Sequence, residues 1–148
     1  MRRNIGKWIG IAFMAAMFCL PGLVMSGEAH AARFVNNNDG TVTDTVTGLM
    51  WADKDNGSPI DWSNAKRYCE GYSGGGKAGW RMPTIDELQQ LYNSGTYGSA
   101  IRITGLAAWS SETNGSLAAI FRFDYGNWLM GSQSSSLYVR ALPVRSGN

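Results

Sequence analysis

Asn36–Gly40, with the sequence NNNDG, places amide and carboxylate oxygens close together, as a calcium-binding loop does. An EF-hand loop needs oxygen ligands at positions 1, 3 and 5, glycine at 6 and glutamate at 12. With the glycine at position 6, Asp39 and Asn37 fill positions 5 and 3. Val35 and Val46 then fall at positions 1 and 12, and neither has a side-chain oxygen. The stretch therefore predicts an Asn-Asp-Gly hairpin turn and no metal site.

Few side chains suit nucleophilic or acid-base chemistry. Cys69 would need a neighbouring base to act as a nucleophile, and the one histidine, His30, lies in a predicted export signal. Asp86 and Glu87 fall in the first turn of a predicted helix, where acids cap the backbone and complement the dipole. Glu112 has no evident partner carboxylate, which a glycoside hydrolase requires. We therefore predict no enzyme activity, no metal and no cofactor; a carbohydrate-active hydrolase is an alternative if a second carboxylate faces Glu112.

Aromatic, amide and guanidinium groups gather in the segment 112–133. Flat rings beside amide groups are typical of surfaces that recognise sugars or polar peptide segments. The alternative for the tryptophan in this set is a place in the core. The predicted ligand-binding residues are Arg122, Tyr125, Asn127, Trp128 and Asn114.

Residues 1–31 have the pattern of a secretory signal peptide. A basic start precedes a mostly apolar run, and Ala29-His30-Ala31 supplies the small residues of a cleavage site. The alternative is an uncleaved membrane anchor. Cleavage leaves residues 32–148, a single domain of 148 − 31 = 117 residues with no membrane span, exported to the periplasm or the extracellular space. The signal holds three of 13 basic and one of 11 acidic residues, so the mature chain has ten of each. Net neutrality gives no support for binding nucleic acid.

The elements that position these residues follow from periodicity and turn residues. Strands are predicted over 34–35, 41–44 and 49–51, separated by Asn-Asp-Gly and Thr-Gly turns. A helix follows over 62–72, which Asp61 begins as its N-cap. Its apolar residues at helical spacing predict one buried stripe: Trp62, Ala65, Tyr68, Cys69 and Tyr72. Cys69 is then either a buried thiol, which we favour, or a disulfide partner of another chain.

The second half of the chain predicts one helix and several strands. Thr84 and Glu87 form a capping box, and the helix that it starts ends near Asn93. Strands are predicted over 107–111, 117–123, 127–131 and 137–144, with a hairpin turn over 124–127. Alternation in the second of these strands predicts that Phe121 and Phe123 face the core. Strands, two helices and further strands indicate an α+β fold.

Four segments together resemble one bacterial family: DGTVTDTVTGLMW, DWSNAKRYCEGYSGGGKAGWRMPTIDELQQL, WSSET and YVRALP. They are similar to the C-terminal domain of the Legionella collagen-like protein, over roughly 34–145. The resemblance implies a C-type-lectin-like fold, in which two helices pack on a twisted antiparallel sheet and the first and last strands pair. It also implies that irregular segments between the later strands face the ligand. The founding member binds sulfated polysaccharides, a property that the neutral mature chain does not support.

The chain departs from the family pattern at Ala141, where many relatives have a second cysteine, so the resemblance implies that Cys69 has lost a disulfide partner. The Glu-Pro-Asn, Gln-Pro-Asp and Trp-Asn-Asp triplets of calcium-dependent lectins are absent too. We expect an exported, non-catalytic binding module that recognises a glycan or an envelope protein. The alternative is a structural subunit of an envelope or surface assembly.

Overall fold

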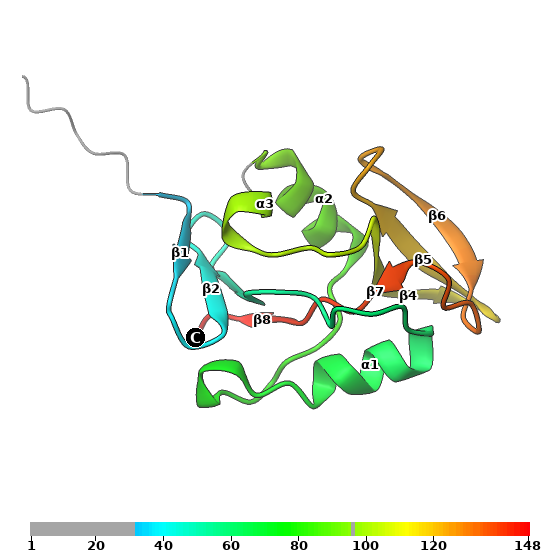
Figure 1. Cartoon of the computed structure of the whole chain (residues 1–148), viewed down its shortest axis with the longest axis horizontal. Helices are drawn as coiled ribbons and strands as arrows, with labels where there is room; N and C mark the ends of the chain where they lie inside the picture. The colour runs from blue at the N-terminus through cyan, green and yellow to red at the C-terminus, as the bar shows by residue number, and fades with distance from the viewer. Residues whose placement is uncertain (1–31, 96) are drawn as a thin grey trace, which may run out of the picture. The chain divides into compact units, whose positions relative to one another are not determined.

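The computed structural model describes residues 32–95 and 97–148 (Figure 1). The predicted signal peptide lies outside these residues. The described residues form an α+β domain with two sheets of four strands each. Among them, no helix has the length and apolar character that crossing a membrane requires.

The first sheet joins the two ends of the domain. Its strands lie in the order β1 (Phe34–Asn36), β2 (Thr41–Asp44), β3 (Leu49–Ala52) and β8 (Val144–Ser146), and all of its pairs are antiparallel. The expectation that the first and last strands pair is therefore wrong. The last strand pairs with β3, so β1 and β8 lie at opposite edges of this sheet.

The second sheet has the order β6 (Asn127–Ser132), β5 (Leu117–Arg122), β4 (Ala107–Asn114) and β7 (Val139–Arg140). Its pairs are antiparallel except that between β4 and β7, which is parallel. The predicted strand over 137–144 is thus two strands in different sheets. Pro143 lies between the two strands, a position where no backbone N–H is needed to pair with a neighbouring strand. Its carbonyl accepts from the Ala52 N–H at 2.9 Å.

Within residues 32–95 and 97–148, three α-helices and one short 3₁₀ turn lie between the strands: α1 (Trp62–Glu70), η1 (Gly74–Gly76), α2 (Ile85–Asn93) and α3 (Tyr97–Ala100). Asp61 caps α1 by accepting from the Asn64 N–H at 3.0 Å, as predicted. The helix ends two residues earlier than predicted, with Gly71 as its C-cap, and the Tyr72 N–H donates to the Cys69 carbonyl, three residues back, at 3.2 Å. The single turn of α3 was not predicted, because four residues give too weak a periodic pattern.

The predicted capping box of α2 is confirmed. The Thr84 hydroxyl accepts from the Glu87 N–H, and the Glu87 carboxylate accepts from the Thr84 N–H at 2.9 Å. Arg81 adds two hydrogen bonds to the same carboxylate, at 2.8 and 2.6 Å. The Trp-Arg-Met-Pro-Thr…Glu motif is therefore one local unit that fixes where α2 begins.

Two apolar clusters cover opposite faces of the second sheet. The first lies between the two sheets and α2, and includes Trp51, Leu88 and Phe121. The second lies between the second sheet and α1, and includes Cys69, Trp109 and Ile120. The burial of Phe121 and Phe123 is confirmed, but Ile120, on the opposite face of the strand, is buried as well. The strand is therefore covered on both faces.

Candidate binding surface

The structure brings only part of the predicted hairpin site together. Arg122 pairs with Asn127 at the end of the β5–β6 hairpin, and Tyr125 lies in the turn between them. The Arg122 guanidinium lies 4.0 Å from the centre of the Tyr125 ring and 3.1 Å from the Asp124 carboxylate. Asp124 thus already partners the cation that was expected to face a ligand.

The other two predicted residues point elsewhere. Asn114 pairs with Leu117, at the opposite end of β5 from Arg122. The two ends lie five residue steps apart along the strand, or roughly 16 Å. Trp128 pairs with Phe121, and successive side chains of a strand alternate in direction, so its ring lies on the opposite face of the sheet from Arg122. Trp128 is 52% exposed, so it is not a core residue, yet the five residues form no single surface.

The Asn-Asp-Gly turn after β1 has the predicted local form. Asn38 and Gly40 have positive φ of 58° and 87°. The Asn37 side chain donates to Thr41 at 2.9 Å, and the Asp39 carboxylate accepts from the Thr41 N–H at 3.1 Å. The described residues contain no group of three acidic, cysteine or histidine side chains placed to share a metal ion.

Cys69 and Glu112 both have structural roles. Cys69 is a free and fully buried cysteine, and burial, with a smaller effect of Glu70, raises the pKa of its thiol to about 12. The interpretation as a buried thiol is confirmed. Glu112 accepts from the Ile85 N–H at 3.0 Å, which places a carboxylate on the start of α2. No local pattern predicts this contact, because the two residues are 27 positions apart.

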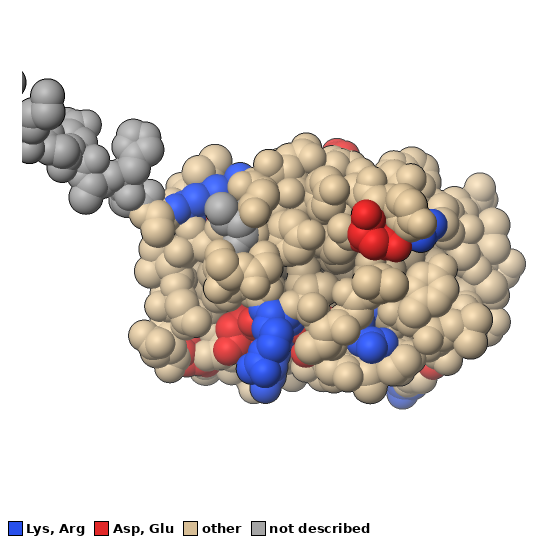
Figure 2. Space-filling model, turned by 45° about the horizontal axis from the view of Figure 1, so that its top comes forward, with Lys and Arg blue, Asp and Glu red and all other residues tan. Residues whose placement is uncertain are grey.

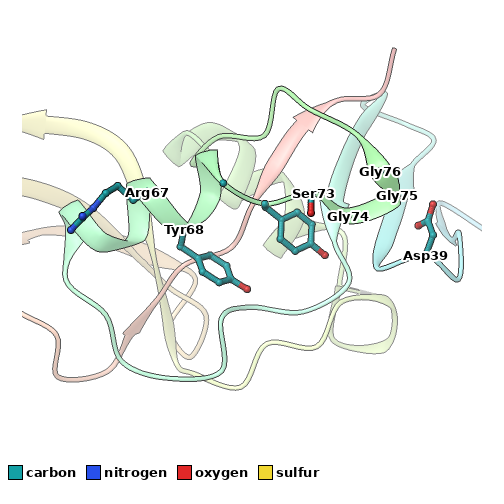
Figure 3. A pocket seen from close by; sticks show the side chains of 9 residues that line it. Asp39, Arg67, Tyr68, Ser73, Gly74, Gly75 and Gly76 are labelled. Atoms are coloured by element: carbon teal, nitrogen blue, oxygen red, sulfur yellow. The ribbon is translucent and has the colours of Figure 1, made fainter.

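A wide groove of about 680 Å³ lies between the end of α1 and the Asn-Asp-Gly turn. Figure 3 shows Arg67 and Tyr68 on α1 at one end and Asp39 at the other, with Gly74, Gly75 and Gly76 between them. A side chain at position 75 would come within 2.8 Å of the Asp39 carboxylate, so glycine keeps this part of the groove open.

Two tyrosines form the aromatic part of this groove. The Tyr72 hydroxyl donates to the Gly40 carbonyl at 2.6 Å, and its ring meets Trp80 edge-on at 4.7 Å, so its position is fixed. Tyr68 lies 6.4 Å from Tyr72 between ring centres and is 37% exposed. Burial, together with nearby acidic groups, raises the pKa of Tyr72 to about 12, so the ring stays a neutral phenol at physiological pH.

A second groove of about 640 Å³ lies on the other side of the same α1 residues, lined also by Ile60, Asp61 and Asn64. Arg67 and Tyr68 line both grooves, and we call this pair the Arg67–Tyr68 ridge. The Arg67 guanidinium donates to the Asn64 side chain, and no ion pair found among residues 32–95 and 97–148 includes it. Tyr68 thus contributes an aromatic ring to the lining of both grooves, whereas the Arg67 side chain points away from Tyr68 and Asp39 in Figure 3 and towards Asn64 of the second groove.

Tyr68, predicted in the buried stripe of α1, is exposed instead, and helical periodicity alone does not predict this ridge. The buried stripe of α1 is narrower than predicted, because Ala65 and Cys69 are fully buried whereas Tyr68 is partly exposed at its margin. The remaining charge is dispersed. On the face in view in Figure 2, basic and acidic residues form small separate groups among uncharged residues.

The described residues form a small α+β domain with two open grooves along one helix. The family model described as the Lcl C-terminal domain matches residues 40–145, and the chain belongs to this family. Membership of this family, which the four sequence segments led us to expect, is thereby confirmed. No curated protein matches the chain.

Proposed function

We propose that this chain is a non-catalytic recognition module with a C-type-lectin-like fold, exported to the periplasm or the cell surface. It binds an extended polar ligand, either a glycan or a segment of an envelope protein, across the Arg67–Tyr68 ridge. The observation that carries the proposal is that two open grooves meet at this one ridge. A ligand that crosses the ridge contacts both grooves at once.

The chemistry of the grooves supports a polar ligand. The ridge supplies a ring face and a guanidinium, and Asp39 and Asn64 supply acceptor and amide groups on its two sides. Aromatic faces bind the apolar side of a sugar ring or a peptide plane, and the charged and amide groups bind hydroxyls or backbone groups. The grooves are shallow and wide, which fits a chain-like ligand better than an enclosed small molecule.

The test measures binding of the purified protein to a glycan array and to immobilised envelope extracts. Tyr68→Ala and Arg67→Ala should each weaken wild-type binding about tenfold, as truncation of a central aromatic or arginine anchor commonly does. Tyr125→Ala is the matched control, because it removes an exposed tyrosine from the hairpin that sequence reasoning favoured.

Three outcomes separate the possibilities. Loss of binding in Tyr68→Ala and Arg67→Ala, but not in Tyr125→Ala, supports ligand binding at the Arg67–Tyr68 ridge. Loss of binding only in Tyr125→Ala assigns the ligand to the hairpin and contradicts binding at the ridge. If the wild type binds neither library, the proposed function itself is contradicted.

A further inference from the structure

Strand β6 is the longest uncovered strand edge among the described residues. It forms one edge of the second sheet, at the far right of Figure 1. At the opposite edge, β7 has two residues, and the Val139 carbonyl of that strand accepts from the Ile60 N–H. In the first sheet, β1 has three residues, and β8 is bridged to Arg81. Uncovered edges of this kind are templates for pairing with another strand.

The hydrogen-bond register shows which backbone groups face outward. The Gln133 N–H donates to the Ser116 carbonyl of the neighbouring strand at 3.0 Å. The backbone N–H and C=O groups of successive residues point alternately to the two sides of an antiparallel strand. Those of residues 131, 129 and 127 therefore also point towards β5, and those of Trp128, Met130 and Ser132 point outward. The Ser132 carbonyl accepts from the Ser135 N–H at 3.0 Å, consistent with this direction. No backbone partner of Trp128 or Met130 on this outer side is found in the described part of the chain.

The edge lacks the features by which proteins block strand pairing. Native edges commonly carry lysine, proline or a bulge, but no residue from Tyr125 to Val139 is charged or proline. The pairing of β5 with β6 runs through all six residues without a register shift. Two copies of this edge can therefore meet without repulsion between like charges.

The side chains of β6 are complementary to those of a second, antiparallel copy. With a two-fold axis at Met130, Trp128 lies opposite Ser132 of the copy and Leu129 lies opposite Gly131 of the copy. Each large side chain thus meets a small one, and Met130 meets itself. Trp128 is half exposed in the single chain, so this pairing would cover its ring.

We propose that β6 pairs with β6 of a second copy of this chain, antiparallel and centred on Met130. The second sheets then join into one continuous eight-stranded sheet. Met130 exchanges two backbone hydrogen bonds with its image, and the Ser132 N–H of the copy donates to the Trp128 carbonyl, while the Ser132 carbonyl keeps its bond from the Ser135 N–H. A contact limited to one strand buries less than the roughly 1,200 Å² of a stable interface, so the dimer is weak and depends on concentration.

The first test is the mass of the purified protein by light scattering over a range of concentrations, without any ligand. The wild type should rise towards twice the monomer mass. Met130→Lys should remain at the monomer mass, because two ammonium groups would face each other across the axis. Leu137→Lys adds the same charge at an 81% exposed position outside the strand and should dimerise as the wild type does.

The second test fixes the register by cross-linking. Under mild oxidation, Met130→Cys should form a disulfide-linked dimer, since directly opposed residues lie within disulfide reach. Ser132→Cys is the matched control, because its image lies four residues along the strand, roughly 13 Å away. A wild type that stays monomeric at every concentration overturns the proposal. So does cross-linking of Ser132→Cys in preference to Met130→Cys. Both measurements are independent of ligand binding, so a negative result here is distinct from a failure of the proposal that a ligand binds at the Arg67–Tyr68 ridge.

Discussion

Replacement of Glu87 tests whether the start of α2 is a unit of three interactions or only a helix cap. Its carboxylate accepts two hydrogen bonds from Arg81 and one from the Thr84 N–H, and its side chain is 15% exposed. The capping bond contributes about 1 kcal/mol. The ion pair adds about 1 kcal/mol more, a value reduced for solvent screening because the Arg81 side chain is 41% exposed.

We therefore expect Glu87→Ala to lower the free energy of unfolding by about 2 kcal/mol. For a domain of this size, this corresponds to a decrease in Tm of roughly 8 °C. Glu87→Gln keeps an acceptor for the Thr84 N–H but loses the charge, so about half of this decrease should remain. Urea unfolding followed by circular dichroism, together with thermal melts, measures both values.

Asp86→Ala is the matched control, because Asp86 is an exposed acid in the same helical turn. It loses only its interaction with the helix dipole, which contributes about 0.5 kcal/mol. Equal destabilisation by Glu87→Ala and Asp86→Ala would refute the reasoning, since the Arg81 ion pair and the capping bond would then contribute nothing.

The pH dependence gives a second check on the same residue. Burial raises the pKa of Glu87, but the Arg81 guanidinium and the Thr84 hydrogen bonds outweigh burial and hold the pKa below its ordinary value of 4.5. A carboxyl group with a lowered pKa in the folded state stabilises the fold above its unfolded pKa, and this stabilisation is lost as pH falls through the folded value. The stability difference between the wild type and Glu87→Gln should therefore be constant near pH 7 and shrink below about pH 4. A difference that stays unchanged down to pH 3 would contradict the ion pair.

Two further predictions concern buried contacts. Because burial raises the pKa of Cys69 to about 12, the native thiol should not react with a disulfide reagent at pH 8. The thiol of the urea-unfolded chain should react fully. Equal reaction rates for the native and unfolded chains would show that the native thiol is accessible. Gly126→Ala should destabilise by about 3 kcal/mol, because φ is +66° and the new methyl group would overlap the Tyr92 ring. Gly57→Ala, at φ +77° with no atom within 4 Å, should cost about 1 kcal/mol in the same urea unfolding measurement, and equal costs would exclude the Tyr92 clash.

Local features of this protein follow from the sequence. The capping box at Thr84 and Glu87, the Asp61 cap and the turn over 124–127 each involve residues within a few positions of one another. Their geometry depends on short-range hydrogen bonds and allowed backbone angles, which the residue types themselves specify. The family assignment rests on the same local segments, and the match over residues 40–145 confirms it.

Contacts between distant segments were decided only by the tertiary structure. Residues 137–144 read as one strand, but the chain divides them between two sheets because β3 and β4 each accept a short strand on an open side. Tyr68 reads as part of a buried stripe, yet it lies at the margin of α1 where no other element covers it. Periodicity specifies which face of a helix is apolar, whereas the neighbouring elements decide how wide the covered face is. For the same reason the sequence alone placed the ligand-binding residues on a hairpin, whereas the fold brings its two open grooves together at Arg67 and Tyr68.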